Sequence, residues 1–484
     1  MIMFRKSILL VFLLLLSSQN FPQLHSESLN REQLKNGIDS LLKDDFFNST
    51  TIAVSAYDLT AGESVYNFNE KRLLTPASNM KLLTSAAGLI FLGPKYNFIT
   101  SVRYTGNIVN NTLYGDLYVI GNFDPDFSTA DLDRFIRDFQ RFGIKEIQGN
   151  LYGDVSVKDS VQWGWGWMWD DDPSADAPYL SALNINSNSI DICVTGSTLG
   201  KKANITTDPQ TEYIRMINNT ITSPFVQHVG ITRDWKSRKN DIYVYGSILP
   251  PEISGNDTVL SSVNIYRPDF YFLTLLKEKL KENGIGLVGK TGLLKTPSTA
   301  KWLSVYGRPY DSVMYYMNKH SDNLSAEMVL YSLAESFNSP PVSAAEGIRV
   351  IDSLLTLSGV GKYEYVIADG SGISRYNLLS ADIILSVLKF VYYHYPNLFE
   401  LYFNSLPVAG LDGTLGSRMQ NSPAQGNVHA KTGTLQGVSC LSGYVKGRNN
   451  HLIAFSILEQ NFINRLSFAR SIQDQICILL SEYE

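Results

Sequence analysis

The two ends of the chain carry strand and helix patterns that complement each other, and this feature constrains the fold more than any other. Near the N-terminus, apolar residues alternate over 52–56 and again over 65–68 after a Thr-Ala-Gly turn, which is typical of a β-hairpin. Near the C-terminus, strand patterns cover 428–433, 438–445 and 452–458, and a helical repeat follows them. Further helical patterns lie between. The sequence therefore predicts one α/β domain built from both ends of the chain.

The middle of the chain has a different character. Residues 99–300 are rich in Tyr, Asn, Thr and Gly, and they contain many short strand patterns. We interpret this stretch as one or two mainly-β domains inserted into the terminal domain.

Residues 1–26 have the features of a secretory signal peptide. Arg5 and Lys6 supply positive charge, and nine consecutive apolar residues follow at 8–16. Nine residues are too few to cross a bilayer but suit a signal peptide. An uncleaved anchor is the alternative. We expect the mature protein to be exported to the periplasm or cell envelope.

Composition excludes several classes of protein. With 41 Lys and Arg against 46 Asp and Glu, the net charge is −5, which argues against a nucleic-acid partner. The cysteines, Cys193, Cys440 and Cys477, are too few for a disulfide scaffold and are expected to be buried free thiols. Six histidines without an HExxH or CxxC pattern indicate no metal centre, and no other cofactor is expected.

An SxxK motif opens a strongly apolar helix that is expected over about 77–92. Ser78 and Lys81 stand at positions i and i+3, so they share a helix face, and Pro76 suits a first turn. The helix N-terminus favours a developing negative charge, and apolar surroundings lower the pKa of a lysine toward that of a usable base. This is the chemistry of a serine nucleophile that is activated without histidine.

An SxN motif, Ser321 and Asn323, precedes a second apolar helix. The hydroxyl could relay a proton, and the amide could hold a substrate. The alternative is structural, because Ser, Asp and Asn are the usual helix N-caps.

A KTG motif lies on an expected strand and comprises Lys431, Thr432 and Gly433, with Thr434 after it. The lysine and hydroxyls could hold a substrate carboxylate, and Gly433 lets the backbone approach closely. The N–H groups of Thr434 and Ser78 could form an oxyanion hole. A polar edge strand is the alternative.

The order of these motifs is more specific than any one of them. SxxK, then SxN, then KTG is the signature of penicillin-binding proteins and serine β-lactamases. A second KTG, at Lys290–Gly292, comes before Ser321 and breaks the order. We interpret it as a strand or turn of the inserted region.

The chain as a whole resembles the class C low-molecular-mass penicillin-binding proteins, which are D-alanyl-D-alanine carboxypeptidases/endopeptidases. The resemblance extends from about residue 50 to 460. It rests on TPASNMKLLT at 75–84, KHSDNL at 319–324, DGSGISR at 369–375 and LPVAGLDGTL at 406–415, and on the stretch from 166 to 184.

This resemblance implies an α+β fold, transpeptidase/β-lactamase-like, in which helices flank both sides of a five-stranded antiparallel sheet. Mainly-β domains are inserted after the nucleophile helix, and the 243 positions between the first two motif serines leave room for them. The expected limits are 27–98 and 301–484 for the catalytic domain, 99–187 and 262–300 for domain II, and 188–261 for domain III.

The resemblance also implies two-step acyl transfer without a metal. Ser78 would attack the carbonyl between the terminal D-alanines of a peptidoglycan stem peptide, with Lys81 as base. Ser321 would pass a proton to the leaving amine, Asn323 would hold the substrate amide, and Lys431 with the following threonine would hold the carboxylate. Peptidoglycan cross-links would be cut alike, and β-lactam antibiotics would acylate the same serine. The alternatives are a serine β-lactamase-like hydrolase and a non-catalytic peptidoglycan-binding scaffold. No oligomeric state is indicated.

A tryptophan run, Trp163 to Trp169, precedes an acidic segment. Its rings could form a glycan-binding platform, although clustered tryptophans often serve packing. We expect Asp170 at the rim of the cleft, paired with the ammonium of a diaminopimelate side chain, and Trp167 packed on the aliphatic part of that side chain. A solvated acidic loop is the alternative.

Overall fold

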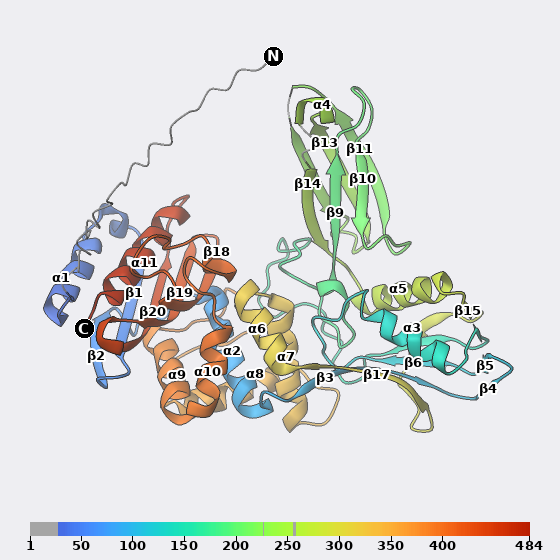
Figure 1. Ribbon diagram of the computed structural model, residues 1–484, viewed down its shortest axis with the longest axis horizontal. Helices are drawn as coiled ribbons and strands as arrows, with labels where there is room; N and C mark the ends of the chain where they lie inside the picture. The colour runs from blue at the N-terminus through green and yellow to red at the C-terminus, as the bar shows by residue number, and fades with distance from the viewer. Residues whose placement is uncertain (1–27, 226, 255–257) are drawn as a thin grey trace, which may run out of the picture.

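The computed structural model describes residues 28–225, 227–254 and 258–484, so the expected signal peptide lies outside the described residues. Both ends of the chain join in one antiparallel sheet of order β18-β19-β20-β1-β2, which confirms the predicted terminal domain (Figure 1). Its strands are β1 (Thr51–Asp58), β2 (Glu63–Phe68), β18 (Val428–Leu435), β19 (Val438–Lys446) and β20 (Leu452–Gln460).

Helices cover both faces of this sheet. Ile52 and Val54 of β1 belong to an apolar cluster shared with two helices, whereas Ala53 between them belongs to a cluster on the opposite face. The period-two alternation of the strand thus separates two cores. The first cluster includes α1 (Arg31–Leu41) and α11 (Leu466–Ser481); the second includes α2 (Met80–Ala87), α6 (Tyr310–His320), α7 (Asn323–Phe337), α8 (Ala344–Leu357), α9 (Ala381–His394) and α10 (Pro396–Ser405).

The chain between α2 and α6 forms an insert with a five-stranded sheet of its own, β16-β8-β6-β3-β17. We expected the catalytic domain to resume at residue 301, but β17 (Lys301–Pro309) pairs along its length with β3 (Asn97–Tyr104) and so belongs to the insert. The other elements are β4 (Asn107–Val109), β5 (Thr112–Tyr114), β6 (Leu117–Ile120), α3 (Leu132–Arg141), β7 (Glu146–Ile147), β8 (Leu151–Asp154), α5 (Pro268–Glu282), β15 (Gly286–Leu287) and β16 (Thr291–Leu293).

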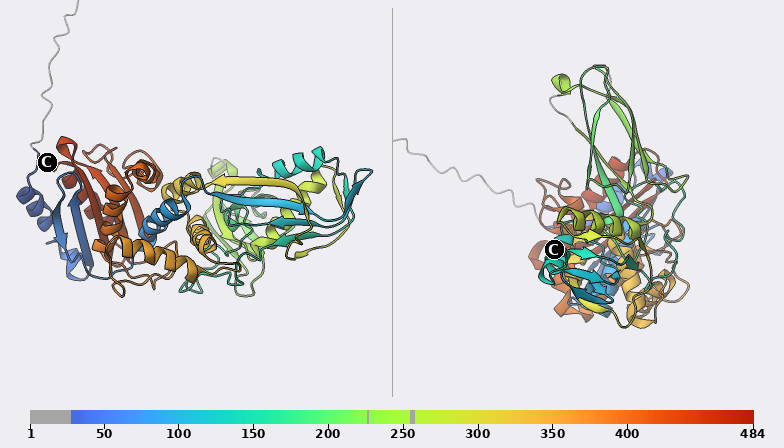
Figure 2. Two further views of the ribbon diagram at one scale, coloured as in Figure 1. Left: turned by 90° about the horizontal axis from the view of Figure 1, so that it is seen from below. Right: turned by 90° about the vertical axis from the view of Figure 1, so that its right-hand side faces the viewer.

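A second, upright lobe projects from this insert (Figures 1 and 2). Two three-stranded sheets, β10-β9-β14 and β11-β13-β12, form it. Its elements are β9 (Ser189–Thr195), β10 (Asn204–Asp208), β11 (Arg215–Thr222), β12 (His228–Arg233), β13 (Asp241–Ile248), α4 (Pro251–Ser254) and β14 (Thr258–Asn264).

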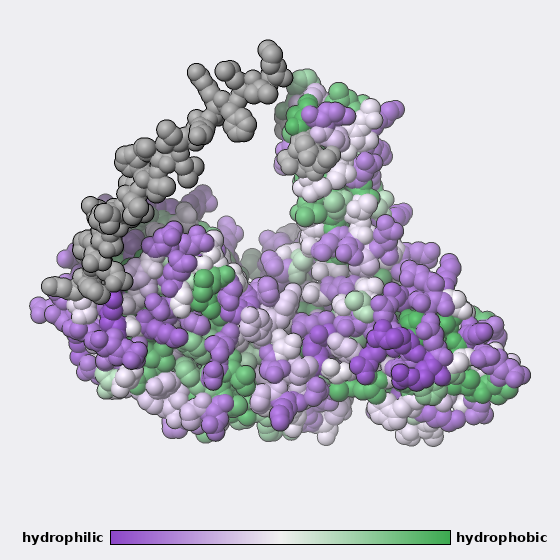
Figure 3. Space-filling model, viewed as in Figure 1, coloured by the Kyte–Doolittle hydropathy of each residue, from purple (hydrophilic) through white to green (hydrophobic). Residues whose placement is uncertain are grey.

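Among the described residues, no helix has the length and apolar character needed to cross a membrane. Cys440 and Cys477 are buried free thiols, whereas Cys193 is only half-buried. Apolar residues on the face shown in Figure 3 form small patches among hydrophilic ones. Short helical turns are η1 (Asp45–Asn48), η3 (Gly88–Leu92), η4 (Asn186–Asn188), η5 (Gly413–Leu415) and η6 (Arg448–Asn450).

Candidate active site

The SxxK serine sits where a 3-10 turn, η2 (Ala77–Asn79), runs into α2. The Nζ of Lys81 lies 2.9 Å from the Oγ of Ser78. Lys81 is fully buried, and this burial lowers its pKa to about 8, although nearby acidic side chains oppose the shift. Ala77, directly before the serine, has a φ of 46°, a left-handed conformation that costs a non-glycine residue about 1–3 kcal/mol.

Two further partners hold Lys81 in place. Its Nζ donates to the Oδ1 of Asn323 at 2.6 Å and to the backbone oxygen of Ser371 at 2.7 Å. A neutral amine has two N–H groups and one lone pair. These two acceptors therefore leave the lone pair for the proton of the Ser78 hydroxyl.

The SxN motif is split between two roles. Asp322, its middle residue, caps α7 by accepting the N–H of Ser325 at 2.6 Å. Asn323 instead bridges two domains, because its Nδ2 donates to the backbone oxygen of Asp176 in the insert at 2.7 Å. The capping alternative thus applies to Asp322, while Ser321 and Asn323 on either side of it line the cleft.

The KTG motif on β18 faces the SxN motif. The Nζ of Lys431 donates to the Oγ of Ser321 at 2.8 Å and to the backbone oxygen of Thr432 at 2.9 Å. Burial, together with the charge of Lys81, holds the pKa of Lys431 well below its usual range. The hydroxyl of Thr432 donates to that of Thr414 at 2.8 Å. This end of the cleft therefore carries several donors close together.

Gly433 is required by a close approach of two backbones. A Cβ at this position would lie 2.8 Å from the backbone oxygen of Pro76 and 3.1 Å from the nitrogen of Ser78. Beside it, the hydroxyl of Thr434 accepts from the guanidinium of Arg470 at 3.3 Å. The strand can lie against the nucleophile turn only because residue 433 has no side chain.

Glu327 is a site residue that the sequence reasoning missed. It is buried on α7, and its carboxylate accepts the backbone N–H groups of Gly370 and Ser371 at 3.0 and 2.8 Å. Burial, and then the charge of Asp369, raise its pKa to about 8. The carbonyl that Lys81 uses belongs to the backbone that Glu327 anchors. An acidic residue among the apolar residues of the first half of this helix was the available signal.

Trp167 is buried and does not line the cleft, contrary to expectation. Its side chain is 6% exposed, and its indole N–H donates to the carboxylate of Asp369 at 2.9 Å. The same carboxylate accepts the N–H of Gly372 at 2.8 Å and of Ser374 at 2.7 Å. Trp167 therefore joins the insert to the loop that supports Lys81.

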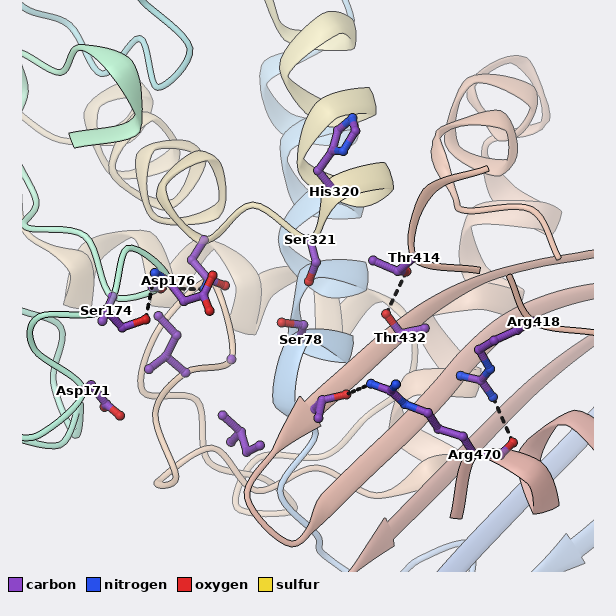
Figure 4. Close-up of a pocket in the computed structure, with 16 residues that line it drawn as sticks. Ser78, Asp171, Ser174, Asp176, His320, Ser321, Thr414, Arg418, Thr432 and Arg470 are labelled. Atoms are coloured by element: carbon purple, nitrogen blue, oxygen red, sulfur yellow. Dashed lines mark hydrogen bonds between the residues drawn. The ribbon is translucent and has the colours of Figure 1, made fainter. Parts of the chain in front are cut away.

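Asp170 also differs from expectation. It is exposed and does not line the cleft, whereas its neighbour Asp171 does (Figure 4). The carboxylate of Asp171 accepts the N–H of Met168 at 2.7 Å. Burial raises the pKa of Asp171, while that N–H and the charge of Arg375 act against the shift. The loop turns inward one residue later than the sequence suggested.

The cleft has a volume of about 410 Å³ and lies between the catalytic domain and the insert. In Figure 4, Ser78 stands at its centre, with Ser321 above it, Thr432 on one side and the loop of Ser174 and Asp176 on the other. Arg418 and Arg470 close the side formed by β18. The second KTG is absent from the cleft lining, since Thr291–Leu293 form the edge strand β16 of the insert, as expected.

Comparison with known proteins identifies this arrangement. The D-alanyl-D-alanine carboxypeptidase of an Actinomadura species is 31% identical over 466 residues, which cover 93% of this chain and 85% of that one. The D-alanyl-D-alanine carboxypeptidase DacB of Haemophilus influenzae is 27% identical over 422 residues, or 84% of each chain. The crystal structure of penicillin binding protein 4 (dacB) from Haemophilus influenzae matches with a TM-score of 0.79 at 25% identity, over 91% of this chain and 97% of that one.

The fold is therefore the penicillin-binding, β-lactamase-like fold that the family resemblance implied. A family model, described as the D-Ala-D-Ala carboxypeptidase 3 (S13) family, matches residues 34–483. That match spans the catalytic domain, the insert and the upright lobe alike. The chain belongs to the D-Ala-D-Ala carboxypeptidase 3 (S13) family of serine peptidases.

Proposed function

We propose that this serine-type D-Ala-D-Ala carboxypeptidase acts through an acyl-enzyme on Ser78. The observation that carries the proposal is the 2.9 Å contact between the Ser78 hydroxyl and the Nζ of Lys81, whose other two partners are acceptors. With its pKa lowered to about 8, Lys81 is neutral in a useful fraction of molecules near neutral pH. It takes the hydroxyl proton as Ser78 attacks the carbonyl between the two terminal D-alanines.

The proposed substrate position places the terminal carboxylate at the β18 side of the cleft. Lys431 and Thr432 hold it, and Arg470 adds positive charge nearby. A bound carboxylate favours the charged form of Lys431, which burial disfavours. The N–H groups of Ser78 and Thr434 serve as the oxyanion hole, a role supported by the close packing at Gly433.

Each bond change then has an assigned group. The Ser78 Oγ–carbon bond forms and the carbon–nitrogen bond breaks. The proton that Lys81 took from Ser78 returns through the Ser321 hydroxyl to the departing amine of D-alanine, which leaves Lys81 neutral for the second step. Asn323 holds the substrate amide. Water then hydrolyses the ester, which releases the shortened peptide and restores the Ser78 hydroxyl. In a β-lactam the broken amide lies in a ring, so the amine remains attached and the adduct persists.

The same chemistry would cut a D-alanyl–diaminopimelate cross-link in peptidoglycan, which makes endopeptidase activity part of the proposal. Asp171, which replaces Asp170 in this role, would pair with the free ammonium of a diaminopimelate side chain at the rim of the cleft. Such a substrate lies outside the cytoplasm, in agreement with the signal-peptide features of residues 1–26.

The test is covalent labelling by fluorescent penicillin. Wild-type protein should be labelled, and Ser78→Ala should abolish the label because it removes the cleft-lining hydroxyl that is bonded to the Nζ of Lys81. Mass mapping of the adduct to Ser321 would contradict the assignment. Rapid release of opened penicillin would favour the β-lactamase alternative, and an unlabelled wild type would favour the scaffold. Digestion of purified cross-linked muropeptides then measures carboxypeptidase and endopeptidase activity separately.

A further inference from the structure

A second cavity, of about 380 Å³, lies where the tryptophan run meets the loop between β12 and β13 of the upright lobe. Trp169 is 68% exposed, and its ring centroid lies 5.0 Å from that of Trp235 in the lobe. We call this cavity the aromatic pocket. Its lining residues are Trp163, Trp169, Asp172, Tyr179, Trp235, Lys236 and Arg238.

The polar side chains at the floor of the aromatic pocket already form hydrogen bonds and an ion pair with one another. The hydroxyl of Tyr179 donates to one carboxylate oxygen of Asp172 at 2.8 Å, and the buried guanidinium of Arg233 pairs with the other. Arg233 also donates from Nε to the Oδ1 of Asn264 at 3.1 Å. The negative charge of Asp172 is thus neutralised within the protein, and the floor offers little to a cationic ligand.

The polar groups that remain available on the walls are donors. Among the described residues, no acceptor lies within hydrogen-bonding distance of the indole N–H of Trp163, Trp169 or Trp235, in contrast to that of Trp167. Lys236 and Arg238 are exposed, and neither pairs with an acidic residue in the described part of the chain. The pocket therefore suits a ligand with flat apolar faces and many acceptor oxygens, and it disfavours an ammonium group.

One loop borders both the aromatic pocket and the catalytic cleft. Asp171, Ser174 and Asp176 line the cleft, whereas Trp169 and Asp172 line the aromatic pocket. Adjacent Cα atoms are about 3.8 Å apart, so the two sites are contiguous. A polymer that places a peptide in the cleft can reach the pocket with the part that carries the peptide.

We propose that the aromatic pocket binds the amino-sugar chain of peptidoglycan. The C–H face of a pyranose ring packs on the Trp169 and Trp235 rings, while hydroxyl and acetamide oxygens accept from the indole N–H groups and from Lys236 and Arg238. The proposal rests on the proposed function in one respect, because the sugar chain is recognised as the carrier of the peptide in the cleft.

The test measures binding of an N-acetylglucosamine tetramer to the full chain by calorimetry. The double variant Trp169→Ala/Trp235→Ala should weaken binding about tenfold or more, as loss of stacking side chains does at other sites. Trp302→Ala is the matched control, because Trp302 is 53% exposed on β17 and does not line the pocket. Lys236→Gln/Arg238→Gln, on an exposed loop, should weaken binding severalfold and gives a second variant if the first misfolds.

A second measurement compares a D-Ala-D-Ala peptide with the same peptide linked to its disaccharide. The double tryptophan variant should lower kcat/KM about tenfold for the disaccharide form only, with penicillin labelling unchanged. Absence of tetramer binding by wild type, or equal binding by wild type and the double variant, would overturn the proposal. So would tighter binding of a single-stranded oligonucleotide, which would assign the pocket to stacked bases. If wild type is labelled by penicillin but gives one of these results, only the sugar-chain proposal fails. If wild type is not labelled, the proposed function itself fails.

Discussion

The chain contains Lys-Thr-Gly twice, each time at the edge strand of a five-stranded sheet, and the two copies differ in their burial and in the residues that they contact. Lys431 is fully buried behind the cleft wall and bonds to the cleft-lining Ser321, whereas Lys290 is exposed at the edge of the insert. The backbone around Lys290 pairs with Asn150, whose Oδ1 accepts the Lys290 N–H at 2.9 Å. The tripeptide therefore has no chemistry of its own. Its function comes from the surface against which the strand packs.

The two glycines show the same contrast at atomic scale. An added Cβ at Gly433 would meet backbone atoms of Pro76 and Ser78 at 2.8 and 3.1 Å. At Gly292 its nearest neighbour would be the ring of Tyr152 at 3.4 Å, an ordinary van der Waals contact. A residue that is indispensable in one copy is thus replaceable in the other.

Replacement of each lysine by alanine should give the largest difference in activity between the two KTG copies. Lys431→Ala removes the donor to the substrate carboxylate and leaves Ser321 without its partner, so kcat/KM for a D-Ala-D-Ala peptide should fall on the order of 100-fold or more. Lys290→Ala should stay within about twofold of wild type, as expected of an exposed surface residue. Steady-state kinetics on the two variants test this prediction. If Lys290→Ala is the impaired variant, the assignment of Lys431 to the active site is wrong.

The glycine pair should show a smaller difference. The Cβ added in Gly433→Ala pushes β18 away from the nucleophile turn. Because acylation depends on the exact placement of the reacting groups, the rate of penicillin acylation should fall by about 10- to 100-fold. Gly292→Ala is the control and should acylate at the wild-type rate, because the Tyr152 ring can yield. Stopped-flow acylation measures both, and circular dichroism checks that each variant is folded.

Lys81 and Lys431 are buried whereas Lys290 is exposed, and the pH dependence of the acylation rate should show this difference. The neutral form of Lys81 is the base, and its pKa is lowered to about 8, so acylation should rise as the pH rises through that value. For a single titration this means about a tenfold increase between pH 7 and pH 9. Lys290→Ala should reproduce the wild-type profile. A rate that is flat over this range would show that Lys81 is not the base.

The adjacent aspartates offer the mildest test, since one lines the cleft and the other is exposed. Asp171→Asn should lower kcat/KM roughly tenfold for stem peptides with a free diaminopimelate amine, through loss of a pair worth about 1–3 kcal/mol. Peptides with an acetylated amine should be unaffected. Asp170→Asn should change neither. Equal losses on both peptides would show that Asp171 does not read the side chain.

Local pattern and motif order sufficed for the catalytic framework. The strands at 428–433, 438–445 and 452–458 were found as β18, β19 and β20, because alternation over one strand reflects burial on one sheet face. The SxxK pair could be recognised from the sequence because residues i and i+3 lie side by side on any helix. Motif order then distinguished the KTG copy that lies in the cleft from the copy that lies on the insert.

Contacts between distant parts of the chain were decided only by the tertiary structure. Glu327 supports a loop more than forty positions away, as its bond to the N–H of Ser371 shows, and Trp167 is bonded to Asp369 across 202 positions. Neither contact leaves a periodic trace in sequence. The place of Asp171 in the cleft depends likewise on how the insert meets the catalytic domain, and the pairing of β17 with β3 joins two segments of the insert that are far apart in the chain. Sequence determined which side chains could do chemistry, and folding determined which of them share a desolvated site, because burial and distance are set by surfaces that meet only in the folded protein.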